Sequence, residues 1–202
     1  GCETYSLCMD YVINHSLLDD KDLTTIKQIE KLLYVASELD CKLLVLPLLE
    51  ESNLEENNID KFIPILQYLS SQASKYNLSI CIESLLKAEA LKKCLDLVNR
   101  SNVKAVFDTG NRVKESNDLY SEITSLGGYI EHVHIKDKNN NGENVILGTG
   151  LVDFRNVFAA LKKINYIGPL NFETTRGRDP IETLAFHMNL CNFFTNEVSK
   201  DL

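Results

Sequence analysis

Four short apolar runs of this 202-residue chain each end in a side chain that can bind a metal ion. Each run is rich in β-branched, aliphatic or aromatic residues and is followed by a helical stretch, which is typical of the strand in a βα unit. The runs are Leu78–Glu83, Val103–Asp108, Ile130–His134 and Pro169–Glu173. In a (β/α)8 barrel the carboxyl ends of the strands meet at one end of the barrel. We therefore expect Glu83, Asp108, His134 and Glu173 to converge there.

Three carboxylates and one imidazole at one point would form a divalent metal site. Carboxylates crowded into a pocket of low dielectric repel one another unless a cation lies among them. Oxygen ligands with one imidazole nitrogen suit Mn²⁺, Mg²⁺, Co²⁺ or Zn²⁺, and they leave coordination positions open for substrate oxygens. The sequence thus predicts one divalent metal ion as the cofactor.

Each ligand candidate also has a purely structural interpretation. Glu83 could be a solvated strand end, and Asp108 could stabilise a turn in the sequence Asp-Thr-Gly-Asn. His132 and His134 face the same side of their strand because side chains alternate. His134 lies nearer the carboxyl end, so we expect it to be the ligand and His132 to be a hydrogen-bonded core residue. The recurrence at four equivalent strand ends favours the metal site over these separate interpretations.

The whole chain alternates predicted strands and helices, and no linker is long enough to divide it. We expect one domain over residues 1–202. Two further strands precede the four ligand-bearing ones, at Thr4–Met9 and Lys42–Pro47. Six helices are expected near Leu23–Leu39, Asp60–Tyr76, Lys87–Asn99, Leu119–Leu126, Asp153–Ile164 and Pro180–Val198.

Composition narrows the classes of function. The formal net charge of −8 and the pI near 5.0 disfavour nucleic acid or an anionic membrane as a partner. No apolar run reaches transmembrane length, and the first residues lack a signal-peptide pattern. Six cysteines form neither a CxxC motif nor a compact disulfide framework, which predicts buried free thiols and a cytoplasmic location. They are Cys2, Cys8, Cys41, Cys81, Cys94 and Cys191.

Five segments occur in the order seen in a known family: IESLL, VFDTGN, HVHIKD, LGTGLVDF and YIGPLNFETT. From about Tyr5 to Val198 the chain resembles the xylose isomerase-like TIM barrel proteins, which include sugar isomerases and epimerases. Within them it is most similar to L-ribulose/L-xylulose-5-phosphate 3-epimerases. The resemblance implies an α/β fold of the (β/α)8 type. Thr4–Met9 would be its third strand, so the first two βα units would be absent from this chain.

The resemblance also implies a function. Glu83, Asp108, His134 and Glu173 would be the metal ligands, and Glu83 and Glu173 would also act as acid and base. A bound carbonyl and its adjacent hydroxyl would be polarised together, which acidifies the C–H between them. Deprotonation gives an enediolate, and its reprotonation gives an epimer or an isomer. A keto-inositol dehydratase, a hydroxypyruvate isomerase and a non-catalytic barrel remnant stay open as alternatives. Four histidines are too few for the zinc cluster of an endonuclease IV-type enzyme.

Several other residues are candidates for substrate binding. The resemblance implies a substrate contact for Asn111, although a plain turn residue is an equal alternative. Basic side chains follow the strands of His134 and Glu173, and such a cluster could hold a sugar phosphate. They are Lys136, Lys138, Arg176 and Arg178. The Gly148-Thr-Gly150 motif alone is weak evidence for phosphate binding. We expect Asp137 to orient His134 or its loop, and Asp153 to cap a helix. The oligomeric state stays open, although barrel enzymes of this group are often oligomers.

Overall fold

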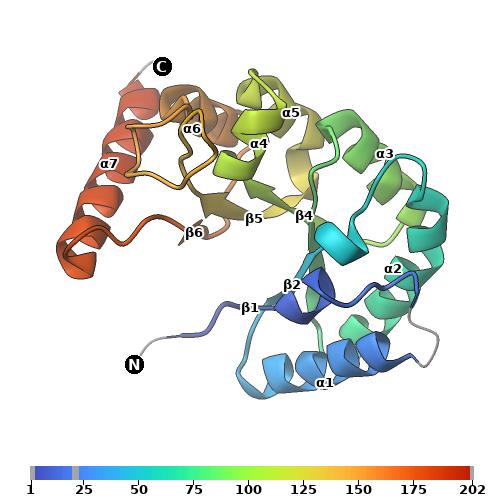
Figure 1. Cartoon of the computed structure of the whole chain (residues 1–202). Helices are drawn as coiled ribbons and strands as arrows, with labels where there is room; N and C mark the ends of the chain where they lie inside the picture. Colours follow the sequence, from blue (N-terminus) through green and yellow to red (C-terminus); the bar gives the residue numbers. More distant parts are fainter. Residues whose placement is uncertain (1–2, 20–22, 201–202) are drawn as a thin grey trace. The chain divides into compact units, whose positions relative to one another are not determined.

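A computed structural model of the chain describes residues 3–19 and 23–200, with side chains described as far as residue 198. The chain divides into two compact units, Gly1–Val106 and Phe107–Leu202. Within the described residues six strands form one sheet in the chain order β1-β2-β3-β4-β5-β6 (Figure 1). The four strand pairs with a described register are all parallel, as crossover connections through helices require.

The first unit contains β1 (Ser6–Cys8), β2 (Leu43–Pro47), β3 (Ser79–Glu83) and the start of β4 (Val103–Asp108). Its helices are α1 (Thr24–Glu38), α2 (Ile59–Ser74) and α3 (Ala88–Val98), with 3-10 turns η1 (Asp10–Ile13) and η2 (Glu50–Ser52). Leu43 pairs with Ser79 and Ile80 with Val103, so the strands are in register with little stagger. This register brings β3 and β4 side by side.

The core of the first unit follows the alternation of side chains along its strands. Buried residues two positions apart cluster on one face of the sheet, namely Leu43, Val45, Cys81 and Val106. Helices α1 and α2 pack against β2 and β3 respectively. They contribute fully buried apolar side chains at helical spacing, such as Ile29 and Leu33 on α1. On β3 the buried residues after Ser79 are apolar up to Glu83 at the carboxyl end of the strand.

The second unit contains β5 (Ile130–Ile135) and β6 (Leu170–Phe172), joined through α6 (Phe154–Lys163). Its other elements are α4 (Thr109–Glu115), α5 (Leu119–Leu126), the 3-10 turn η3 (Gly127–Tyr129) and α7 (Pro180–Lys200). Helix α6 packs against both α5 and α7. Val133 pairs with Leu170 and Ile135 with Phe172. This pairing places the ends of β5 and β6 next to each other.

Most of the expected elements are present with boundaries shifted by a few residues. Strand β6 ends at Phe172, so Glu173 is the first residue beyond the strand rather than its last. Helix α4 was not expected, since its sequence Thr109–Glu115 has no apolar periodicity. It begins because the Asp108 side chain accepts a hydrogen bond from Asn111 N at 2.8 Å. Asp153 caps α6 in the same way, as predicted.

The five described cysteines are free thiols, four of them buried, and Cys2 lies outside the described residues. Burial raises the pKa of both Cys94 and Cys191 to about 11, so these thiols are held protonated and unreactive. Among the described residues, no helix combines the length and apolar character needed to span a membrane.

Candidate metal centre

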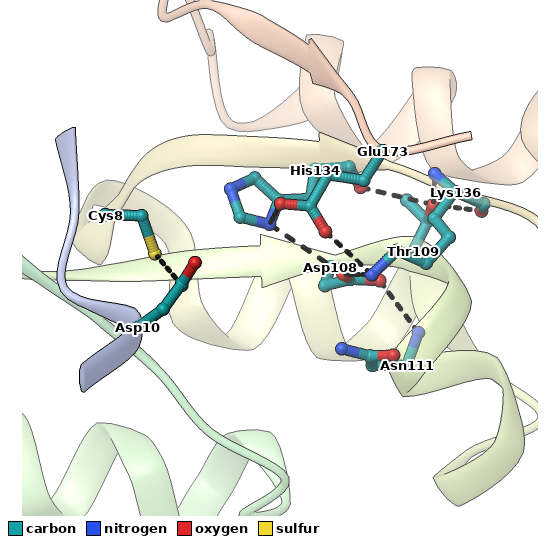
Figure 2. Close-up of polar contacts among 8 residues, drawn as sticks. All are labelled: Cys8, Asp10, Asp108, Thr109, Asn111, His134, Lys136 and Glu173. Atoms are coloured by element: carbon teal, nitrogen blue, oxygen red, sulfur yellow. Dashed lines mark hydrogen bonds and ion pairs between the residues drawn. The ribbon is translucent and has the colours of Figure 1, made fainter. Parts of the chain in front are cut away.

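Three of the predicted ligands come together inside the second unit. The His134 ring projects from β5, and its Nδ1 lies 3.1 Å from Glu173 Oε1 and 3.8 Å from Asp108 Oδ2 (Figure 2). Two ligand atoms that each lie about 2.1 Å from one ion at right angles are about 3.0 Å apart. The distance between His134 and Glu173 matches this spacing, whereas the distance between His134 and Asp108 is wider. All three atoms are of types that bind metal ions. Asp108 and His134 are buried, while the Glu173 side chain is 38% exposed.

Lys136 supplies positive charge to the same carboxylates. Its ammonium Nζ lies 2.7 Å from Asp108 Oδ2 and 2.8 Å from Glu173 Oε2. Burial by itself would lower the pKa of Lys136, but the two carboxylates outweigh it and raise the pKa above its ordinary value. The sequence predicts that Lys136 lies on a loop above the pocket. The structure instead buries it directly after β5, inside the cluster.

The pKa of Asp108 is lowered although its carboxylate is almost fully buried. Burial alone would raise this pKa, but the nearby His134 ring and the Lys136 ammonium more than offset it. Asp108 is therefore ionised at neutral pH. The structural interpretation of Asp108 does not exclude a role as a ligand, because Oδ1 accepts from Asn111 N while Oδ2 faces Lys136 and His134.

The Asp-Thr-Gly-Asn motif fastens the start of α4 to the end of β5. The Thr109 hydroxyl donates to Lys136 O at 2.6 Å and accepts from Lys136 N at 2.9 Å. Gly110 leaves room for the lysine, since a Cβ there would lie 2.7 Å from Lys136 Cγ. Sequence reasoning missed the roles of Thr109 and Gly110. The only available signal was the motif itself, because their partners lie about 27 residues further along the chain.

His132 is buried one step deeper on the same face of β5. Its ring and that of His134 meet edge to face, with centroids 5.1 Å apart. Burial, with a smaller contribution from His134, lowers the pKa of His132 to about 4. The ring is therefore neutral at physiological pH, which agrees with its expected place in the core.

Glu83 ends β3 in the first unit and is 7% exposed. It lies two positions beyond Cys81, so both side chains are on the face of β3 that carries the apolar cluster of Leu43, Val45, Cys81 and Val106. Asp108 likewise lies two positions beyond Val106 on β4. Each carboxylate thus follows a core residue on the same face of its own strand.

Asp137 organises the loop that follows β5. It is fully buried, and its carboxylate accepts hydrogen bonds from the backbone N–H groups of Gly148, Gly150 and Val152 at 2.9 to 3.0 Å. This matches the expectation that Asp137 orients its loop. The two glycine amides of the Gly148-Thr-Gly150 motif are consequently directed at Asp137 and not at an external phosphate.

The remaining basic candidates lie outside the cluster. Arg176 and Arg178 are exposed on the segment between β6 and α7, and Lys138 is half-buried. Asn111 is half-buried in the first turn of α4, next to Asp108. Only Lys136 among the predicted substrate-binding residues has a described ion pair with a ligand candidate.

Known proteins resemble both the sequence and the fold. The pattern of the xylose isomerase-like TIM barrel family matches residues 2–190. An L-ribulose 3-epimerase of Methylomonas sp. is 40% identical over 80 residues, which are 40% of this chain and 27% of that protein. The L-ribulose-5-phosphate 3-epimerase UlaE of Salmonella paratyphi C is 42% identical over 67 residues, 33% of this chain and 24% of that protein. The matches thus span about a quarter of each relative.

A solved structure shows the same fold along nearly the whole chain. The xylose isomerase domain protein of Planctomyces limnophilus has a TM-score of 0.81 at 19% identity, and the match covers 98% of this chain and 79% of that one. The predicted fold class and the predicted resemblance are both confirmed. The chain belongs to the xylose isomerase-like TIM barrel family.

Proposed function

We propose that this protein is a metal-dependent epimerase or isomerase of a sugar or sugar phosphate. The observation that carries the proposal is the convergence of His134 Nδ1 with carboxylate oxygens of Asp108 and Glu173 at the ends of three elements of the second unit. Relatives named as epimerases of L-ribulose and its 5-phosphate support the substrate class. A single barrel-type domain over the whole chain is part of the same proposal.

Glu83 is the proposed fourth ligand. Glu83, Asp108 and His134 are all buried, and their carboxylate and imidazole groups are of the types that can hold a metal ion. Strands β3 and β4 are paired in register, and Glu83 and Asp108 both follow apolar core residues at the carboxyl ends of these strands. A buried carboxylate at such a position needs a cation or a hydrogen-bond network to offset the cost of burial.

The donor set determines which metals fit. Three carboxylates and one imidazole nitrogen suit Mn²⁺, Mg²⁺, Co²⁺ or Zn²⁺. When bound, such an ion polarises a substrate carbonyl and the neighbouring hydroxyl. Asp108 is suited to bind the metal without taking part in proton transfer, because its other oxygen, Oδ1, caps helix α4.

The two glutamates are the proposed acid and base. Glu173 is partly exposed and Glu83 ends a different strand, so each could approach a bound sugar from its own side. One carboxylate would remove the proton next to the carbonyl to give an enediolate, and the other would return a proton to the opposite face. Lys136, Asn111 and Arg176 are the proposed contacts for substrate oxygens or a phosphate.

Replacement of either glutamate tests this assignment. Glu83→Gln and Glu173→Gln keep an oxygen in place but cannot accept the proton, so turnover should fall about 10²- to 10⁴-fold and chiefly in kcat. Glu115→Gln, an exposed change at the end of α4, is the matched control. The assay follows deuterium incorporation from D₂O by NMR at saturating Mn²⁺, with L-ribulose and L-ribulose 5-phosphate as substrates.

The outcomes separate the parts of the proposal. Near-normal turnover in both glutamine variants would rule out these residues as acid and base. A wild-type protein that binds no stoichiometric divalent ion would refute the metal-dependent function and would favour a non-catalytic barrel remnant. Conversion of only one of the two sugars would decide whether the substrate is phosphorylated.

A further inference from the structure

A buried histidine of α7 links two loops of the second unit. His187 is 1% exposed, and neither sequence motifs nor the proposed chemistry assign it a role. Its Nε2 accepts a hydrogen bond from Leu147 N at 3.4 Å, and its Nδ1 lies 3.0 Å from Thr174 Oγ1. The rings of Phe172 and Phe186 pack around it, with centroids 6.1 and 5.8 Å from the imidazole. These contacts hold the ring in one orientation.

The partners of His187 determine its tautomer. A backbone N–H can only donate, so Nε2 must be the unprotonated nitrogen. Nδ1 then carries the proton and donates it to the Thr174 hydroxyl. Burial lowers the pKa of His187, which favours the same neutral ring. The contact with Thr174 is thus a directed hydrogen bond from a rigid side chain.

Thr174 directly follows the proposed ligand Glu173. Strand β6 ends at Phe172, and Glu173 N makes the last described backbone hydrogen bond to β5, with Ile135 O at 3.2 Å. Beyond it, the segment that leads to α7 has no regular secondary structure. The hydrogen bond from His187 therefore fixes the backbone at the point where the sheet no longer does.

We propose that His187 is a positioning residue that holds Glu173 in place for metal binding through its hydrogen bond to Thr174. This inference rests on the proposed function, because it assigns Glu173 to the metal. Removal of a group that orients a metal ligand without binding the metal itself typically weakens metal binding about 10- to 100-fold. Because Thr174 acts through the backbone and not on the carboxylate itself, we expect the lower end of that range.

Two amide substitutions separate the two hydrogen bonds of the ring. The Asn amide lies close to the position of Nδ1, so His187→Asn can keep the bond to Thr174. The Gln amide lies close to the position of Nε2, so His187→Gln can keep only the bond to Leu147. Thr174→Val removes the hydroxyl at constant shape, and Thr174→Ser restores it. His15→Asn, on an exposed histidine of the first unit, is the control for the chemical change.

Isothermal titration of the metal-free proteins with Mn²⁺ provides the test. H187Q and T174V should bind Mn²⁺ about tenfold more weakly than the wild type, whereas H187N, T174S and H15N should stay close to it. Should H187Q fail to fold, T174V tests the same contact. Unchanged affinity in H187Q and T174V would overturn this inference alone. A wild type without a Mn²⁺ site would overturn the proposed function and the inference with it.

Discussion

Removal of the buried ammonium of Lys136 should destabilise the metal-free protein and make it bind metal more tightly. Lys136→Met keeps the aliphatic length of the side chain but leaves Asp108 and Glu173 without their cationic partner, 2.7 and 2.8 Å away. Breaking a fully buried ion pair costs about 3 to 5 kcal/mol. Asp108 is 2% exposed and Glu173 38% exposed, so solvent screens the second contact. We therefore expect a loss of about 3 kcal/mol in the free energy of unfolding.

Mn²⁺ should recover most of this loss. In the wild type the ion has to compete with the ammonium for the same two carboxylates, whereas in K136M it meets them without a competitor. A ligand that binds only the folded state at a thousand times its Kd adds about 4 kcal/mol of stability. If the difference between the two proteins falls from about 3 to about 1 kcal/mol, K136M binds Mn²⁺ about thirtyfold more tightly.

Urea unfolding with and without saturating Mn²⁺ measures both quantities, and titration calorimetry measures the affinity separately. Lys163→Met, on an exposed lysine at the end of α6, is the matched control and should change neither. A K136M protein as stable as the wild type without metal would show that Lys136 does not offset the charge of these carboxylates. A stability difference that Mn²⁺ leaves unchanged would show that lysine and metal do not share them.

Two further predictions concern the neighbours of this cluster. Gly110→Ala places a Cβ 2.7 Å from Lys136 Cγ, so urea unfolding should show a loss of about 1 to 3 kcal/mol, as for other overpacked sites. Lys136→Ala removes the contacts with Cγ and Cδ but leaves the Cβ of residue 136 at 2.9 Å, so it should relieve part of this added loss, and an unchanged loss would contradict the steric reason. The pKa of His132 falls from 6.5 to about 4 on folding, so its neutral ring contributes stability that is present above pH 6.5 and is lost as the pH falls toward 4. The wild type should lose up to about 3 kcal/mol of its free energy of unfolding in this pH range, and His132→Gln should not show this loss. If urea unfolding gives the same pH dependence for both proteins, His132 is not the group responsible. The lowered pKa of Asp108 acts in a separate window, below its ordinary value of 3.8.

The sequence predicted the elements that carry a strong hydrophobic period. The strand from Val103 to Asp108 and the helix from Leu119 to Leu126 have the expected boundaries, because buried faces set the pattern of apolar residues. Helix α4 was missed because a side-chain cap, and not an apolar face, starts it. The ends of β1 and β6 were overestimated, since strand propensity continues beyond the last paired residue.

The sequence predicted that Asp108, His134 and Glu173 lie close together, but it did not predict the contacts that hold them there. Ligand types at strand ends can be read from the chain once the strands are known. The buried ion pairs of Lys136 and the bond from His187 to Thr174 join residues brought together only by the fold. Local sequence carries no signal for such contacts. An exposed and a buried lysine after a strand look the same until their partners are placed.

The fixed loop after β5 has a consequence for protein engineering. Its amides at positions 148, 150 and 152 all donate to one carboxylate, that of Asp137. The number of residues between these amides is therefore fixed. A residue inserted between them would direct the amides that follow it away from the Asp137 carboxylate. The preceding turn, closed by the hydrogen bond between Asn139 N and Glu143 O, is exposed at its tip. A short peptide tag or a reporter can therefore be accommodated between Asn140 and Asn141, while the spacing of residues 148 to 152 has to be kept.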